Sequence, residues 1–73
     1  MNIISTADTS RAGADRYIEE TYTLAEQFGV YAVIRFCHIS GWGGAAEVNV
    51  LIATTDQAEA RKVYKEVIIR AKN

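Results

Sequence analysis

The run from Val30 to Ile39 constrains the fold of this 73-residue chain more than any other segment. It is rich in β-branched and aromatic residues and contains neither Gly nor Pro, so it predicts a β-strand. A glycine-rich loop at 40–45 follows, and apolar residues alternate again at 47–54. Sequential strands joined by a short loop pair antiparallel. The sequence therefore predicts a hairpin at the centre of the fold.

Alternation divides this hairpin into two faces, because successive side chains of a strand point to opposite sides. In the first strand one face carries Val30, Ala32, Ile34, Phe36 and His38, and the other carries Tyr31, Val33, Arg35, Cys37 and Ile39. In the second strand one face carries Val48, Val50 and Ile52, and the other carries Asn49, Leu51 and Ala53.

Apolar spacings of three and four residues predict a helix on each side of the hairpin. The first extends from about Ser10 or Asp15 to Phe28 and ends at Gly29. The second follows Asp56, whose spacing from Glu59 fits a capping box. Residues 1–9 fit a short strand or a flexible arm equally well. The apolar positions of the two helices are Tyr17, Ile18, Thr21, Leu24, Ala25 and Phe28, then Ala60, Val63, Tyr64, Val67, Ile68 and Ala71.

The expected fold class is α+β, a single two-layer (β)αββα domain over residues 1–73. Each helix has one apolar stripe to bury, so both helices should cover the same face of the hairpin. The other face is then exposed, and we expect an oligomer to bury it. The residues expected on that open face are Tyr31, Val33, Cys37, Ile39, Leu51 and Ala53.

The size of the chain supports the same expectation, since domains this small often depend on disulfides, metals or oligomerisation. Cys37 and His38 are the single cysteine and the single histidine. One chain therefore lacks the residues for an internal disulfide or a closed zinc site. We expect no metal and no cofactor, and self-association into a homodimer or higher oligomer.

Charge and hydropathy limit the other partners. The formal net charge is −1, so there is no basic excess to neutralise a phosphate backbone, and we expect no nucleic-acid partner. The apolar runs are too short to span a bilayer, and no charged leader followed by an apolar stretch begins the chain. These features predict a cytoplasmic protein with no membrane partner, in which a lone thiol is ordinary.

Five residues are candidates for a ligand site or an interface: Tyr31, Arg35, Cys37, His38 and Trp42. Cys37 and His38 are neighbours in a strand and so point to opposite faces, which prevents a nucleophile and base pair within one chain. Arg35 at the centre of a strand needs a carboxylate, a ligand or solvent, and Glu47 or an acid of another copy could pair with it. Trp42 lies in a loop that could cradle an anion, or its side chain could cap the core or the dimer. No catalytic residue is assigned.

Several segments carry a resemblance to a known family: Phe28-Gly29-Val30, Phe36-Cys37-His38, Gly41, the strand 47–53, and Ala58-Glu59-Ala60. From Ile18 to about Ala71 the chain resembles the C-terminal part of the catalytic, large subunit of molybdopterin synthase. In that family a His-Arg pair follows the second strand, and later lysines serve the sulfur-donor tail of the small subunit. Here the turn reads Thr54-Thr55-Asp56-Gln57, and the chain ends before that lysine segment. The resemblance implies a relative that keeps the scaffold without its chemistry.

We therefore expect a small homo-oligomeric domain that acts as a non-catalytic binding or oligomerisation module. One alternative is a sulfur-transfer enzyme or subunit that uses Arg35, Cys37 or His38 across a dimer interface. Another is small-molecule binding at the subunit interface around Trp42.

Overall fold

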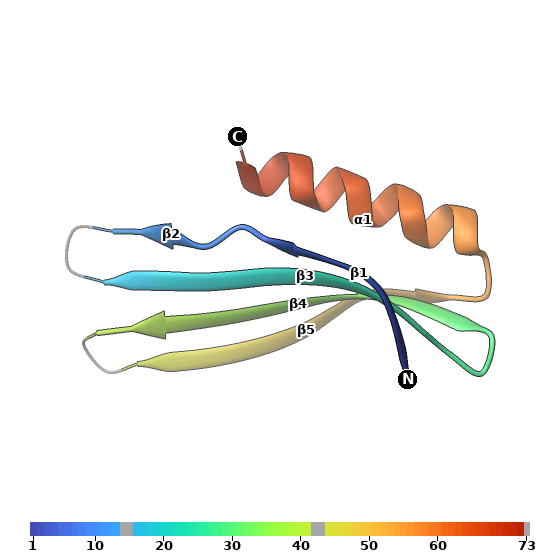
Figure 1. The fold of residues 1–73 in the computed structure, drawn as a ribbon, viewed down its shortest axis with the longest axis horizontal. Coiled ribbons are helices and arrows are strands. Elements are labelled where there is room, and N and C mark those ends of the chain that lie inside the picture. The colour runs from blue at the N-terminus through green and yellow to red at the C-terminus, as the bar shows by residue number, and fades with distance from the viewer. Residues whose placement is uncertain (14–15, 42–43, 73) are drawn as a thin grey trace.

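The structure is a computed structural model that describes residues 1–13, 16–41 and 44–72 (Figure 1). Its strands pair antiparallel in the order β1-β3-β4-β5, and β2 pairs with the N-terminal part of β3. One helix lies across a single face of this sheet (Figure 1). The elements are β1 (Asn2–Asp8), β2 (Arg11–Ala12), β3 (Tyr17–Gln27), β4 (Val30–Ser40), β5 (Ala45–Thr54) and α1 (Gln57–Lys72).

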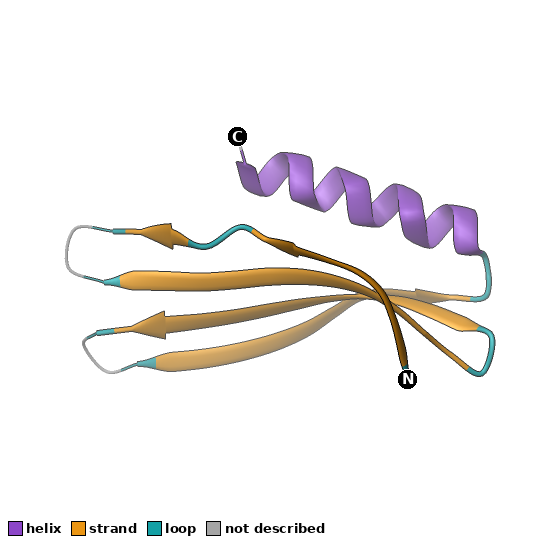
Figure 2. Cartoon of the chain, in the orientation of Figure 1, coloured by secondary structure: helices purple, strands orange, loops and turns teal. Residues whose placement is uncertain are grey.

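The predicted two-helix (β)αββα fold is wrong, because the first predicted helix is a strand. Residues 17–27 form β3, a central strand that pairs with β1 and β2 on one side and with β4 on the other. Thr21, Tyr22 and Thr23 favour an extended chain, and Ile18, Tyr22 and Leu24 also follow the period of two. Pairing along both edges of β3 outweighs the helical spacing of its apolar residues. The described residues thus form mostly antiparallel sheet with one C-terminal helix (Figure 2).

A two-residue turn explains why Gly29 does not end a helix. Phe28 and Gly29 both have left-handed backbone angles, with φ of 54° and 79°, and Gln27 pairs with Val30 across them. Positive φ at both central positions is the signature of the type I′ turn, whose twist suits a tight hairpin. The predicted helix end is therefore the β3–β4 hairpin turn.

The predicted hairpin and C-terminal helix are both present. β4 pairs with β5 along most of its length. Asp56 caps α1, since its Oδ1 accepts hydrogen bonds from the backbone N–H groups of Ala58 and Glu59 at 3.0 and 3.3 Å. The backbone N–H of Asp56 donates to Thr54 Oγ1 at 3.1 Å and not to Glu59, so only half of a capping box forms.

The core lies between α1 and one face of the sheet. Leu24 and Val33 are fully buried there against Ala60 and Tyr64 of the helix. The hydroxyl of Tyr64 donates a hydrogen bond to Ser5 Oγ at 3.1 Å, which ties α1 to β1. The remaining apolar positions predicted for this helix also pack on the core: Val63, Val67, Ile68 and Ala71.

The helix covers the face that the sequence predicted to be open. Tyr31 packs on the core and Val33 and Cys37 are buried, so the prediction of an open face at these residues is wrong: this is the covered face. A bulge in β5 adds a second change: Val33 pairs with Ile52 and Ile34 with Val50, which leaves Leu51 as the extra residue. Ile52 therefore packs under α1, on the side opposite to Val48 and Val50. Within the described residues, no helix is long and apolar enough to cross a membrane.

Candidate functional site

A buried carboxylate organises the sheet beside the C-terminal end of α1. Glu20 of β3 is only 3% exposed. It is a charged residue on the same face of β3 as the apolar residues Ile18, Tyr22 and Leu24. Its Oε2 accepts a hydrogen bond from Arg35 Nε at 2.9 Å, and the Arg35 Nη2 lies 2.8 Å from the same oxygen. Its Oε1 accepts from Thr9 Oγ1 at 2.8 Å and more weakly from Arg11 Nη1 at 3.4 Å. The carboxylate is thus fully satisfied despite its burial.

The same residue fixes the segment between β1 and β2. The backbone N–H of Thr9 donates to the carbonyl oxygen of Glu20 at 2.8 Å, and the backbone N–H of Glu20 donates to Ser10 Oγ at 3.1 Å. These bonds replace the regular strand ladder where the chain passes from β1 to β2. They place Arg11 in the lining of a pocket between α1 and the sheet.

Electrostatics keep Glu20 ionised. Burial is the largest single influence and would raise its pKa, but hydrogen bonds from Thr9 and Arg35 and the charges of Arg35 and Arg11 together outweigh it. The pKa of Glu20 therefore lies below its ordinary value. A charged Glu20 offsets the positive charge that Arg35 brings to the centre of the sheet.

Arg35 lies on the helix-covered face and not on an open one, which corrects its predicted position. Besides Glu20 it contacts β5, where its Nη1 donates to Asn49 Oδ1 at 3.2 Å and lies 3.8 Å from Glu47 Oε2. The predicted pair with Glu47 is therefore present but long, and Glu47 is 65% exposed. The closer pair with Glu20 carries most of the interaction.

The other candidate residues are not brought together. Cys37 is buried beneath the helix-covered face, directly opposite Glu20 in the register. His38 faces the other side, where its Nδ1 lies 3.8 Å from Glu19 Oε2. Tyr31 packs on the core near the β3–β4 turn. Trp42 lies outside the described residues, so the structure does not place that candidate.

The second surface of interest is the sheet face opposite α1, here called the helix-free face. Its central rows are Ala25-Ala32-Ala53, Thr23-Ile34-Val50 and Thr21-Phe36-Val48 across β3, β4 and β5. Polar side chains, those of Glu19 and His38, appear in the next row, Glu19-His38-Ala46. Val48 and Val50 are each 63% exposed, and Phe36 is 39% exposed. A contiguous exposed apolar surface of this kind is typical of a site that binds another molecule.

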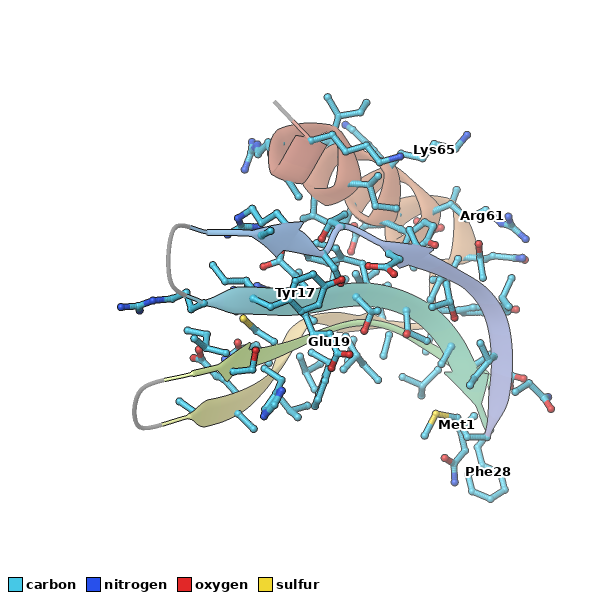
Figure 3. All side chains as sticks on the ribbon, turned by 60° about the vertical axis from the view of Figure 1, so that its left-hand side comes forward. Met1, Tyr17, Glu19, Phe28, Arg61 and Lys65 are labelled. Atoms are coloured by element: carbon cyan, nitrogen blue, oxygen red, sulfur yellow. The ribbon has the colours of Figure 1, made fainter. Side chains whose placement is uncertain are left out.

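This face has both a bulky side chain and a hollow. Phe36 is the largest apolar side chain of the three central rows and is 39% exposed. Four residues along β4, a hollow of about 140 Å³ opens over the small side chains of Ala25 and Ala32. Val30, Ile34 and Met1 form its walls. Figure 3 shows Met1 at the same corner of the molecule as Phe28 of the β3–β4 turn.

Sequence reasoning missed Glu20 because it assigned the segment from about Ser10 or Asp15 to Phe28 to a helix. Thr9 and Arg11 lie around the start of that predicted helix, where nothing linked them to Glu20. One signal was available. In a strand, Glu20 shares a face with Ile18, Tyr22 and Leu24, and a lone carboxylate in an apolar row requires a buried cation. Arg35, at the centre of the next strand, is the matching group.

Across the part of the chain that the structure describes, no group of three or more His, Cys, Asp or Glu side chains could hold a metal ion. No protein-family model, curated protein or solved structure matches this chain. The resemblance to molybdopterin synthase and the sulfur-transfer alternative therefore stay predictions.

Proposed function

We propose that this chain is a non-catalytic binding module that works as a homodimer, in which two copies pack their helix-free faces together. The observation that carries the proposal is that one apolar face holds both the large, partly exposed side chain of Phe36 and a hollow over Ala25 and Ala32. A two-fold axis across the Ile34 row would place Phe36 of each copy over the hollow of the other. Such self-complementarity is what an isologous dimer requires.

The size of the face supports a second copy as the occupant. Four strands about 4.8 Å apart and roughly ten residues long, at about 3.3 Å per residue, present a flat area of roughly 600 Å². Standard interfaces bury about 800 Å² on each partner, a value that protruding side chains bring within reach. The polar Glu19–His38 row would then lie at the rim, where interfaces are polar.

The dimer proposal is tested by exchanging the bulky side chain and the hollow. Ala32→Phe fills the hollow and Phe36→Ala removes the bulky side chain, so each change alone should weaken dimerisation roughly a hundredfold, since every dimer has two such contacts. The double variant moves the bulky side chain to position 32 and the hollow to position 36, and should recover most of the affinity. Analytical ultracentrifugation over a protein dilution series measures the dimer dissociation constants of the wild type and of the three variants.

A matched control uses the other side of the molecule. Ile69 is 61% exposed on α1, close to the 63% of Val50, so Ile69→Asp and Val50→Asp remove similar exposed apolar area. Val50→Asp should give a folded monomer, and Ile69→Asp should leave the dimer intact. Equal effects of the two variants, or a double variant no better than the single ones, would overturn this arrangement.

The same proposal includes the compartment. We place the module in the cytoplasm, which is supported by the lone buried thiol of Cys37.

A further inference from the structure

A larger pocket lies on the opposite side of the sheet from the helix-free face, between the C-terminal part of α1 and strands β2 to β5. It has a volume of about 600 Å³, within the range of small-molecule sites. Its charged lining residues are Arg11, Arg35, Arg70 and Glu20, and Leu51 and Val67 form part of its apolar wall. Three guanidinium groups therefore share this pocket with one lining carboxylate.

The three arginines of the pocket differ in how closely they are paired with acidic or polar side chains. Arg35 directs its donors to Glu20 and Asn49, which leaves it as part of the floor. Arg11 makes only one long contact with Glu20, at 3.4 Å, and its side chain is 54% exposed. Among the described residues no ion pair is recorded for Arg70, which is exposed on the last turn of α1. Glu47 pairs only distantly with Arg35, at 3.8 Å, and is mostly in solvent.

One carboxylate is enough to neutralise Arg35, so Arg11 and Arg70 leave the pocket mouth positively charged. Guanidinium groups match the planar, multidentate geometry of oxyanions. The C-terminal end of α1 would repel an anion weakly, and two arginines outweigh that partial charge. The apolar wall beside them favours a ligand that also has a hydrocarbon part.

We propose that this pocket binds a small organic oxyanion, either a carboxylate or a phosphate monoester. Arg11 and Arg70 hold the oxyanion from two sides, and Leu51 and Val67 contact the hydrocarbon part. Glu20 and Thr9 act as positioning residues, because they fix the segment that carries Arg11. The site does not depend on the dimer, since it opens on the other side of the sheet.

The test is an NMR titration of the full chain with four probes: hexyl phosphate, hexanoate, inorganic phosphate and hexylammonium. The oxyanion with the preferred head group should shift the amide signals of Arg11, Glu20 and Val67 in a saturable way. Its affinity should exceed that of inorganic phosphate at least about tenfold, because the hexyl chain buries apolar area. Comparison of hexyl phosphate with hexanoate identifies the head group. Hexylammonium should leave these signals unchanged.

Variants assign the binding to the pocket. Arg70→Gln and Arg11→Gln should each weaken binding of the preferred probe about tenfold. Leu51→Asn should weaken the hexyl probe without changing the weak binding of inorganic phosphate. Arg61→Gln is the control, because Arg61 lies on the same helix, is exposed and does not line the pocket (Figure 3).

Three results would overturn the proposal: no saturable shift at these residues, binding of hexylammonium, or an Arg61→Gln effect as large as that of Arg70→Gln. Val50→Asp separates this proposal from the dimer, since that variant should lose the dimer and keep the pocket. If the unaltered protein forms the dimer but binds none of the oxyanion probes, the pocket proposal is contradicted and the dimer proposal is not.

Discussion

Glu20 is a single carboxylate in a row of apolar side chains, and it holds three elements together. It pairs with Arg35 of β4, accepts a hydrogen bond from Thr9 and contacts Arg11 of β2. Removing one partner of a buried ion pair costs more than the pair itself contributes, because the remaining charge is left without compensation. The stability of the β1–β3–β4 region should therefore depend on this one residue.

Glu20→Gln should lower the free energy of unfolding by about 2 kcal/mol, because the Arg35 guanidinium loses its charged acceptor. Arg35 keeps some contact with solvent, which holds the loss below that of a fully buried pair. Urea unfolding at a fixed protein concentration measures the change. The neighbouring Glu19→Gln, on the helix-free face and 58% exposed, should change stability by less than about 0.5 kcal/mol. Equal losses in the two variants would show that Glu20 has no special role.

The stability of the wild-type chain should fall in acid more than that of Glu20→Gln. The pKa of Glu20 is lowered in the folded state, so its contribution is complete above the ordinary value of 4.5. It is lost as the pH falls through the lower, folded pKa. Unfolding free energies measured from neutral pH to below pH 4.5 should therefore converge between wild type and variant. A difference that stays constant across this range would refute the lowered pKa.

Substitutions at Phe28 and Gly29 should change stability in opposite directions, although both residues lie in one turn. Phe28 is a non-glycine residue in the left-handed region and is 92% exposed, so it has strain and little packing. Phe28→Asn should raise stability by about 1 kcal/mol, because Asn-Gly is the preferred type I′ pair. Gly29→Ala should lower it by a similar amount, although nothing lies within 4 Å of the added methyl group. Thermal unfolding of both variants measures these changes. A stability change of the same sign in both variants would contradict the type I′ turn.

At the scale of elements, residues 17–28 show why local periodicity alone assigns the wrong structure. Tyr17, Ile18, Thr21, Leu24, Ala25 and Phe28 fit a helical stripe. Ile18, Glu20, Tyr22 and Leu24 fit one face of a strand, except that Glu20 is charged. Only the distant partner Arg35 makes that charge acceptable, and pairing with β1 and β4 is nonlocal. The strand 30–40, the strand 45–54 and the helix 57–72 have no such ambiguity and were predictable.

The assignment of faces depended on that one element. With two helices expected, the hairpin face carrying Val33 and Cys37 was predicted to be open. With β3 in the sheet and α1 as the one helix of the described chain, that face instead becomes the core. The β5 bulge at Leu51 then moves Ile52 to the core side. Alternation shows which residues share a face, but which face is covered depends on tertiary packing.

The candidate site was only partly predictable for the same reason. Arg35 stands out in the sequence as a charge within a strand, and its pair with Glu47 exists at 3.8 Å. Its closer partner, Glu20, was assigned to a helix. Arg11 and Arg70 lie far apart in the sequence. They line one pocket because β2 pairs with β3 near the C-terminal end of α1. No local sequence pattern predicts that two such distant residues line the same pocket.

At the scale of the whole molecule, the sheet has one face covered by α1 and one face of exposed apolar rows. The proposed dimer gives four layers, with the two sheets packed at the centre and the helices outside. The arginine-lined pocket then remains open to solvent on each outer side. Dimerisation and ligand binding would thus use opposite faces of the same sheet.

The central claim is that the helix-free face is buried between two copies, and sedimentation equilibrium of the unaltered protein tests it most directly. The chain has a mass of 8.1 kDa. At micromolar concentrations we expect twice that mass, with Val50→Asp returning it to the single-chain value and Ile69→Asp leaving it unchanged. A single-chain mass for the unaltered protein throughout this range would contradict the account.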